Sequence, residues 1–522
     1  MAFAPSFRDP AGFCFSFRNR IFRAVYSEFA ADLVAFLASS ITEDLCSSHQ
    51  LVTTRILSEA EIQGLNQDSQ FHRLIQNPKI ACILEHERIF FPSYPHEWCP
   101  EMLHDSGLLT LHIAHHALEE GFSLKDATPL NVLFRGPNAV FVDILSFVRR
   151  SPTNYLWRPY SQFIRTFMFP LLLHRDLMIP LADLFINRRD GLCPLEVFKM
   201  CGFWRKLAPP YLQLVSFPTW MSHFKTEKSM NRLGAKPVGD PQRVRYILDS
   251  LFTHLHGSFC KLQPRSTATS QWSGYTTSHS YSDKSFAAKE CFVREILGEF
   301  PPKRVLDVGS NSGHFSVLAA RAGTEVVAID SDPAVISLLF QRAKTEQLNI
   351  LPLIVDLAHP TPGLGWCNSE QASFLDRVRG TFDLVLMLAV VHHLLVAARI
   401  PLRSILELLS EMTTDLAIIE FIPCEDPMFM EIIRGREHLH SDWNQKAFAE
   451  ACRQHFEIVR VQPLEGSDRV LFLLRKSYDE FLRVECRLRS YEAVSASQFR
   501  DLFSPELTMS ESGEQVSRSP FI

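Results

Sequence analysis

No two cysteines in this sequence have the C-x-x-C spacing, although twelve cysteines are present. Their scatter argues against a disulfide framework and a structural zinc site, so we expect no metal centre and reduced thiols in a cytoplasmic protein. The N-terminal residues lack a continuous apolar core, which argues against a signal peptide. The most apolar run, LVLMLAVVHHLLVAARIPL from residue 384, is interrupted by two histidines and an arginine. It predicts a strand followed by a helix rather than a membrane span.

Two nucleotide-binding patterns are missing from the turn in VLDVGSNSGHFSVLAARAGTEVVAID, residues 305–330. A dinucleotide fold requires G-x-G-x-x-G, but counting from Gly309 the second and third glycine positions hold Asn311 and His314. The turn also lacks the G-x-x-x-x-G-K-[ST] phosphate loop. A carboxylate, Asp307, enters the turn instead, and it suits a cationic amino-acid ligand better than a pyrophosphate. The pattern therefore argues against a dehydrogenase.

Charge is unevenly distributed along the chain. The formal net charge is −5, yet residues 149–245 contain 16 Lys/Arg against 6 Asp/Glu, so the remainder is strongly acidic. A basic middle in an acidic protein favours an anionic ligand or partner. The alternative is a solvated surface that faces an acidic domain.

Composition divides the chain into four segments. We expect an α+β domain over 1–261, with helices around 27–39 and 101–120. A polar linker or lid follows at 262–285, LQPRSTATSQWSGYTTSHSYSDKS. Residues 286–480 alternate between apolar strands and helices. The polar tail, 481–522, is expected to be disordered.

The third segment predicts an α/β fold with a mostly parallel sheet, because its strands alternate with helices. The expected strands are 305–308, 325–329, 350–355, 383–388, 416–421, 456–461 and 469–474. The expected helices are 313–322, 333–346, 395–411 and 444–455. A short turn around 464–467 joins the last two strands and requires an antiparallel hairpin at one end of the sheet.

The turn after the first of these strands is suited to a ligand at the carboxyl edge of the sheet. Gly309 permits a sharp turn and close approach, Asn311 tolerates left-handed backbone angles, and Gly313 lets the helix start close to the strand. Asp330 ends the second strand, where its carboxylate can accept hydrogen bonds from two ribose hydroxyls.

At these residues the sequence resembles the class I S-adenosylmethionine-dependent methyltransferases, which have a Rossmann-like sheet. D-x-G-x-[GN]-x-G at 307–313 is similar to their first motif, with Asn311 in place of the central glycine. The resemblance implies S-adenosylmethionine as cofactor and the seven residues that follow as its contacts. They are Asp307, Gly309, Asn311, Gly313, Asp330, Asp356 at the adenine amino group, and Leu388 in the fourth motif, LMLAVVHHL.

The phrases LKDATPLNVLF, ILPLIVDLAHPTPGLGW, LAVVHHL and IIEFIP resemble a bacterial methyltransferase family related to a host-specific nodulation protein. This resemblance extends to the N-terminal half and so spans nearly the whole chain. It does not identify the methyl acceptor.

The N-terminal half contains a kinase-like loop in KDATPLNVLFRGPNAVFVDILSF, from residue 125. Asp126 and Asn131 have the D-x-x-x-x-N spacing of a kinase catalytic loop, and Asp143 follows the next strand. In kinases these positions hold the base and the magnesium ligands. The flanking His-Arg and Phe-Gly are absent, as are a glycine-rich loop and its lysine. The open alternatives are a kinase-like scaffold, a coincidence, and real phosphoryl transfer with a nucleotide and metal.

Methyl transfer to a hydroxyl or amine requires a base. His392 and His393 follow the fourth strand, and either is a candidate base; the alternative for each is a capping or packing role. Glu420 ends the fifth strand and could orient a histidine or the acceptor. Further candidates for the pocket are Trp272, Tyr275, Tyr281 and Lys289, which could close over the cofactor, and Trp366, as pocket wall or core.

The leading hypothesis is therefore an S-adenosylmethionine-dependent methyltransferase that acts on oxygen or nitrogen of a small or glycan-like acceptor, recognised by the N-terminal half. An RNA or protein methyltransferase ranks lower, because no RNA-binding signature is present. A phosphotransferase using Asp126, Asn131 and Asp143, and a non-catalytic adaptor that keeps the cofactor pocket, are the remaining alternatives. We expect no membrane partner, and the sequence does not define the oligomeric state.

Overall fold

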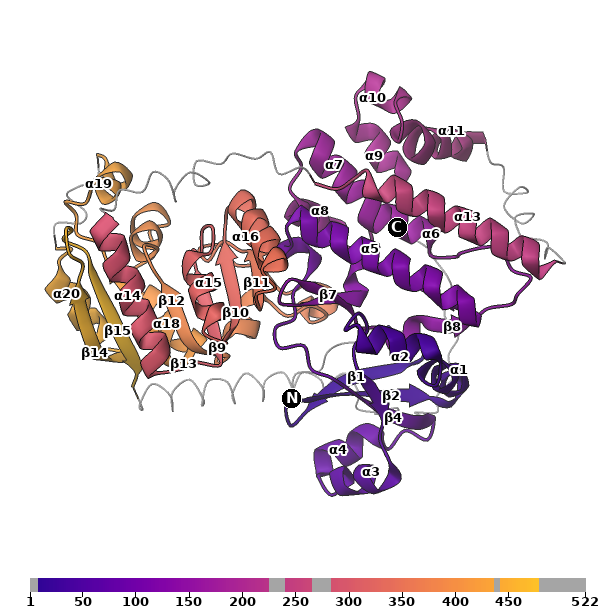
Figure 1. Cartoon of the computed structure of the whole chain (residues 1–522), viewed down its shortest axis with the longest axis horizontal. Coiled ribbons are helices and arrows are strands. Elements are labelled where there is room, and N and C mark those ends of the chain that lie inside the picture. The colour runs from indigo at the N-terminus through magenta and orange to yellow at the C-terminus, as the bar shows by residue number, and fades with distance from the viewer. Residues whose placement is uncertain (1–7, 225–239, 265–282, 436–441, 478–522) are drawn as a thin grey trace, which may run out of the picture.

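The computed structural model describes residues 8–224, 240–264, 283–435 and 442–477. The chain forms a strand-and-helix region before residue 265 and a second region around a seven-stranded sheet (Figure 1). Trp272, Tyr275 and Tyr281 of the expected lid lie outside the described residues, as does the expected disordered tail.

The larger sheet has the strand order β11-β10-β9-β12-β13-β15-β14. The first five strands in this order are parallel to one another, while β15 is antiparallel to both of its neighbours. The mostly parallel sheet and its antiparallel end hairpin are therefore confirmed. The strands are β9 (Arg304–Val308), β10 (Glu325–Asp330), β11 (Ile350–Ile354), β12 (Phe382–Met387), β13 (Thr413–Phe421), β14 (Phe456–Pro463) and β15 (Val470–Lys476).

Helices cover both faces of this sheet, so its central strands are buried on both sides. Alternate residues of β9 belong to different hydrophobic clusters: Val305 packs in one and Leu306 in the other. The helices are α14 (Asp283–Glu299), α15 (His314–Arg321), α16 (Pro333–Thr345), α17 (Phe374–Val378), α18 (Leu402–Met412), α19 (Pro427–Ile433) and α20 (Gln445–Cys452).

Two sequence predictions in this region were wrong. The single helix expected over 395–411 is a short π-helix, His393–Ala397, followed by α18. Pro401 precedes α18; its ring restricts Ile400 and it has no N–H to continue the earlier helix. The linker expected over 262–285 is also shorter at its C-terminal end, because α14 begins at Asp283.

The N-terminal region combines strands and helices, as expected for an α+β arrangement. Its four-stranded antiparallel sheet has the order β1-β2-β4-β3, with β1 (Gly12–Phe17), β2 (Arg20–Tyr26), β3 (Thr54–Ile56) and β4 (Ile80–His86). Two short antiparallel pairs follow: β5 (Phe122–Leu124) with β8 (Phe147–Arg149), and β6 (Val132–Arg135) with β7 (Asn138–Phe141).

Helices form the rest of this region, and α13 runs beside α5 (Figure 1). Before the long helix α5 (Pro100–Ala117) come α1 (Ser27–Leu37), α2 (Ser40–Ser47), α3 (Glu59–Asn66) and α4 (Ser69–Ile75). After it come α6 (Tyr160–Phe163), α7 (Phe169–Leu177), α8 (Leu181–Asn187), α9 (Pro194–Met200), α10 (Phe203–Leu207), α11 (Phe217–Phe224) and α13 (Pro241–Cys260).

The two regions are packed against each other through a shared hydrophobic cluster and buried ion pairs. Arg377 of α17 pairs with Glu97, whose side chain is completely buried, and Thr361 donates to the same carboxylate at 2.6 Å. Glu101 of α5 accepts hydrogen bonds from Ser337 and Gln341 of α16. These contacts fix the N-terminal region on the sheet. Among the described residues, none of the helices combines the length and apolar character that crossing a membrane requires.

Candidate active site

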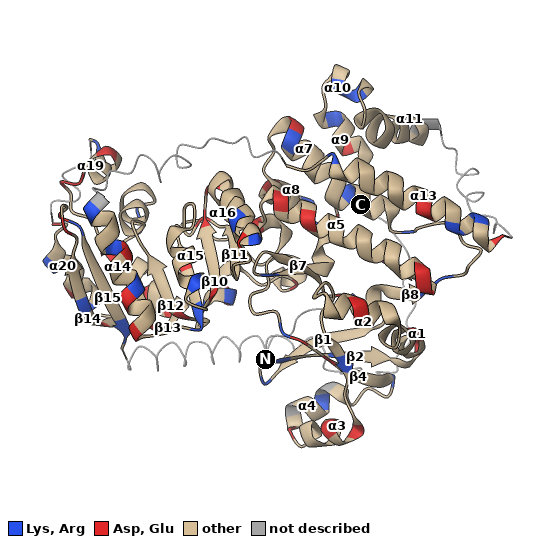
Figure 2. Cartoon of the chain, viewed as in Figure 1, with Lys and Arg blue, Asp and Glu red and all other residues tan. Residues whose placement is uncertain are grey.

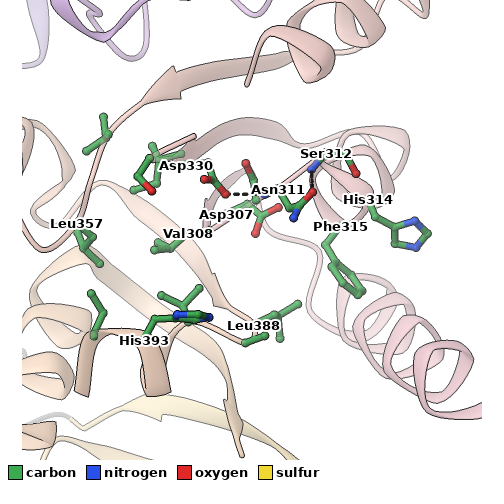
Figure 3. Close-up of a pocket in the computed structure, with 18 of the residues that line it drawn as sticks. Asp307, Val308, Asn311, Ser312, His314, Phe315, Asp330, Leu357, Leu388 and His393 are labelled. Atoms are coloured by element: carbon green, nitrogen blue, oxygen red, sulfur yellow. Dashed lines mark hydrogen bonds between the residues drawn. The ribbon is translucent and has the colours of Figure 1, made fainter. Parts of the chain in front are cut away.

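A pocket of about 300 Å³ opens at the carboxyl ends of β9, β10 and β12. His393 and Leu388 lie across it from Asp330 and Asn311 (Figure 3). Seven of the ten residues that the sequence predicts for the cofactor or the chemistry line this pocket: Asp307, Gly309, Asn311, Asp330, Asp356, Leu388 and His393. Gly313, His392 and Glu420 do not line it.

The turn after β9 depends on three residues with positive φ. Gly309, Asn311 and Gly313 have φ of 67°, 49° and 80°. A Cβ on Gly309 would lie 2.4 Å from Val390, and one on Gly313 would lie 2.2 Å from Leu339 of α16. Gly313 therefore permits α15 to pack close to α16.

Asp330 shapes the same turn from the end of β10. Its carboxylate accepts hydrogen bonds from the backbone N–H of Asn311 at 2.9 Å and of Asp332 at 3.0 Å. Burial raises the pKa of Asp330 above its usual value, although these hydrogen bonds oppose the change. Each carboxylate oxygen keeps a second lone pair for a ligand hydroxyl.

Asp307 is the deepest acid of the pocket and is only 3% exposed. The Ser316 hydroxyl donates to its carboxylate at 2.5 Å. Burial raises the pKa of Asp307 to about 7, against the effect of that hydrogen bond. A cationic ligand group beside Asp307 would favour its ionised form.

Asp356 follows β11 at the rim of the pocket and is half-exposed. It accepts hydrogen bonds from the backbone N–H of Ala358 and from His359 Nδ1, both at 2.9 Å. The adjacent Leu357 adds an apolar surface to the pocket wall. This edge therefore combines a fixed acceptor with an apolar contact, which suits an aromatic ring that carries an amino group.

The two adjacent histidines have different surroundings. His393 lines the pocket, and burial lowers its pKa. His392 is 3% exposed and its ring packs on Phe429, with centroids 6.1 Å apart. Burial holds the pKa of His392 well below its usual value, and the charges of His393 and Arg469 lower it further. The geometry thus favours His393 over His392 as a base.

Glu420 does not line the pocket, and its carboxylate pairs with Lys289, which does. Lys289 of α14 lines the pocket, and its ammonium lies 2.6 Å from the completely buried Glu420 carboxylate. Burial lowers the pKa of Lys289, and Glu420 opposes this change. Lys289 therefore belongs to a helix with a buried ion pair and not to the expected lid.

Sequence reasoning missed Phe286, His314, Phe315 and Leu357 as pocket residues. His314 and Phe315 directly follow the glycine turn, and Leu357 directly follows Asp356, so their positions beside predicted residues were a usable signal. Trp366 is 64% exposed, which corrects its prediction as pocket wall or core.

The kinase-like loop lies in the N-terminal region, and none of its three residues lines the pocket. Asp126 is exposed, and Asp143 accepts a hydrogen bond of 2.9 Å from the guanidinium of Arg23 in β2. Asn131 is the last residue of a short 3-10 helix, Pro129–Asn131, and directly precedes β6. In the part of the chain that the structure describes, no group of three or more His, Cys, Asp or Glu could hold a metal.

Comparison with known proteins gives a family for both parts of the chain. A family model described as a methyltransferase domain matches residues 286–458. The nodulation protein NoeA of Rhizobium meliloti (strain 1021) is 30% identical over 477 residues, which cover 91% of this chain and 96% of NoeA.

Two solved structures have only a distant likeness to this chain. The N-methyltransferase NodS from Bradyrhizobium japonicum WM9 is 15% identical, with a TM-score of 0.28, over 37% of this chain and 98% of NodS. The bifunctional kinase-methyltransferase WbdD is 18% identical, with a TM-score of 0.28, over 37% of this chain and 40% of WbdD. Scores this low add nothing to the family relationship, which rests on the family model and on NoeA.

Proposed function

The chain belongs to the family of the nodulation protein NoeA and is an S-adenosylmethionine-dependent methyltransferase, and we propose that its acceptor is an oxygen or nitrogen atom of a small or glycan-like molecule. The observation that carries this proposal is the presence of Asp307, Asp330, Asp356 and His393 around one pocket. Three acids at different depths suit the cofactor, and a histidine across the pocket from Asp330 suits an acceptor that must lose a proton.

The lining residues suit the ribose, the adenine and the amino-acid part of S-adenosylmethionine in turn. Asp330, with its oxygens held by backbone N–H groups, would accept hydrogen bonds from the ribose hydroxyls. Asp356 would accept one from the adenine amino group. Asp307 and Lys289, which both line the pocket, would face the ammonium and the carboxylate of the amino-acid end. The bound cofactor supplies a methyl group on a positively charged sulfur.

His393 is the residue that we assign to proton removal. Its lowered pKa keeps the imidazole neutral at pH 7, so a ring nitrogen can accept a proton from an acceptor hydroxyl or amine. Glu420 is a positioning residue in this proposal, because it holds Lys289 at the pocket wall. His392 supports the same segment by packing on Phe429.

The N-terminal region, up to about residue 261, is proposed to recognise the acceptor. Its fixed attachment to the sheet through Glu97 and Arg377 supports a shared site rather than two independent modules. The excess of Lys and Arg over residues 149–245 would favour an anionic acceptor. An RNA or protein acceptor would use the same basic stretch, but no particular contact favours it.

Phosphoryl transfer by the kinase-like loop is less well supported. Arg23 lies against Asp143, so a guanidinium already neutralises a carboxylate that a magnesium ion would need. A second acid, Asp9, lies 3.3 Å from the same guanidinium. This arrangement suits a scaffold better than a metal-dependent phosphotransferase.

Calorimetric titration with S-adenosylmethionine tests the cofactor residues. We expect micromolar binding, about −8 kcal/mol, that is lost in Asp330→Ala and kept in Asp126→Ala. A titration with ATP and magnesium runs beside it. Binding of ATP that depends on Asp126, without binding of S-adenosylmethionine, would move the chemistry to the kinase-like loop.

Transfer of a radiolabelled methyl group tests the acceptor class. The panel contains amino sugars, oligosaccharides, sugar phosphates, RNA and peptides, each incubated with the full chain. Label in the sugar-containing acceptors would support the proposal. Label confined to RNA or peptide would overturn the acceptor class while leaving the cofactor site intact.

A further inference from the structure

A second pocket, of about 360 Å³, lies in the N-terminal region. It is formed by the 3-10 turn after α5 and Gly121, by Arg149 and the residues that follow β8, and by the first turns of α13. None of its lining residues belongs to the cofactor pocket. Three of them are arginines that come from opposite ends of the basic stretch: Arg149, Arg150 and Arg245.

Arg150 is the most confined of these cations. Its guanidinium donates to the carbonyl of Asn154, and its backbone N–H donates to Gly121 at 3.0 Å. No carboxylate of the described residues lies within ion-pair distance of its guanidinium. Burial lowers the pKa of Arg150, which means that the cation has lost hydration without gaining a counter-charge. A ligand anion would supply that counter-charge.

The other two arginines are also weakly compensated. Arg149 stacks its guanidinium over the Phe122 ring, 5.3 Å from the centroid, and its backbone N–H donates to the carboxylate of Asp32. Arg245 lies 3.8 Å from Asp249, a carboxylate that is also 3.1 Å from His115 Nε2. Lys and Arg on α13 can be followed in Figure 2.

The pocket also contains one acid and an apolar floor. Glu119 is 56% exposed and pairs with His116 at 2.9 Å, so it offsets only part of the positive charge. Leu118, Leu248 and two prolines, Pro152 and Pro241, supply the apolar lining. The start of α13 adds little by itself, because Asp240 already caps it.

We propose that this pocket binds the phosphate group of a small organic phosphate, such as a sugar phosphate. Three guanidinium groups offer planar pairs of N–H donors, which match the oxygens of a phosphate better than a monovalent halide or a neutral sugar. The apolar lining would contact the organic body. A cavity of about 360 Å³ has room for a compact phosphorylated molecule. This site stands on its own contacts and does not depend on methyl transfer.

The test is calorimetric titration of the full chain with glucose 6-phosphate at low ionic strength. Inorganic phosphate, sulfate and glucose are titrated in parallel. The variants are Arg150→Gln, Arg245→Gln and a matched control, Arg243→Gln. Arg243 is exposed on the same helix, two residues from Arg245, and does not line the pocket. S-adenosylmethionine binding and the melting temperature report whether each variant is folded.

We expect glucose 6-phosphate to bind and Arg150→Gln or Arg245→Gln to weaken binding about tenfold or more. Arg243→Gln should bind as the unchanged protein does, and glucose should give no heat. Absence of heat with phosphate or sugar phosphate up to about 10 mM would overturn the proposal. Equal loss in Arg243→Gln would also overturn it, since the effect would then come from overall charge. Equal binding of sulfate and glucose 6-phosphate would overturn the contribution of the organic body.

Discussion

The ammonium of Lys289 in α14 lies 2.6 Å from the carboxylate of Glu420 in β13, and both side chains are almost completely buried. Arg469 lies 3.6 Å from the same carboxylate and pairs with Asp426 at 2.7 Å. Two cationic and two anionic side chains thus form one buried ion-pair network behind the pocket. Because Lys289 lines the pocket, the network fixes the helix that closes one of its walls.

Removing one member of this network should strongly destabilise the protein. Lys289→Met leaves the Glu420 carboxylate buried, with the guanidinium of Arg469 3.6 Å away. Breaking a buried ion pair in this way costs about 3–5 kcal/mol, and we expect the lower end because Arg469 remains. Equilibrium unfolding in urea measures the loss.

Lys284→Met is the matched control on the same helix. The Lys284 side chain is 77% exposed, and its ion pair with the equally exposed Glu465 is long, at 3.9 Å. Loss of this side chain should therefore change the unfolding free energy by less than about 1 kcal/mol. If the two variants unfold at the same urea concentration, the buried network does not stabilise the fold.

Asp307 should make stability depend on pH. Burial raises its pKa to about 7 in the folded chain, compared with about 4 in an unfolded chain. Between these values the folded state binds more protons than the unfolded state, so the contribution of Asp307 to stability falls as pH rises from about 4 to about 7. Asp307→Asn should flatten this part of a plot of unfolding free energy against pH. An unchanged slope in that variant would contradict the raised pKa.

The same carboxyl group should release a proton when S-adenosylmethionine binds. Near pH 6.5 the free site is partly protonated, and the cofactor ammonium would favour the carboxylate. Calorimetry in buffers of different ionisation enthalpy counts the protons released. We expect release in the unchanged protein and none in Asp307→Asn. Uptake of protons would place the cofactor ammonium away from Asp307.

Asn311 should tolerate glycine and reject a β-branched residue. Its φ of 49° is in the left-handed region, which costs a side chain with a Cβ about 1–2 kcal/mol unless a local hydrogen bond compensates. Asn311 has one, since its Oδ1 accepts from the backbone N–H of Ser312 at 2.6 Å. Asn311→Gly should keep S-adenosylmethionine affinity within about threefold. Asn311→Val should lower both stability and affinity, and equal affinities in titration would show that the turn does not constrain the site.

The sheet could be predicted from the sequence because its strands are buried on both faces. A strand of this kind is a short apolar run with a turn at each end, and the run at 350–355 became β11, Ile350–Ile354. The acids that line the pocket were also predictable. Asp330 and Asp356 each directly follow such a run, and parallel strands bring their carboxyl ends to one edge.

Other features depend on contacts between distant residues. Lys289 was expected in a lid, but its partner Glu420 is 131 residues later in the chain, and no local pattern indicates such a pair. Arg23 reaches Asp143 across 120 residues for the same reason. Trp366 is exposed on a turn with positive φ at Cys367 and Asn368, and a tryptophan in the sequence carries no sign of that exposure.

The sequence also gave no way to choose between His392 and His393, since two identical neighbours follow one strand. The choice comes from the π-helix that begins at His393, which directs one ring to the pocket and the other to Phe429.

If His393 is the base, His393→Gln should lower methyl transfer about 10²–10⁴-fold and leave S-adenosylmethionine affinity nearly unchanged. His392→Gln should reduce stability, while the rate per folded molecule stays within about tenfold.

The pH dependence of transfer separates the two histidines further. Burial lowers the pKa of His393 below 6.5, so the ring is neutral at pH 7 and becomes protonated only as pH falls below that lowered value. The transfer rate should therefore fall on the acid side with a midpoint below pH 6.5, and this limb should disappear in His393→Gln. Direct titration of the ring by NMR checks the same pKa without an acceptor. A limb that persists in His393→Gln and is lost in His392→Gln would assign proton removal to His392, against the lining of the pocket.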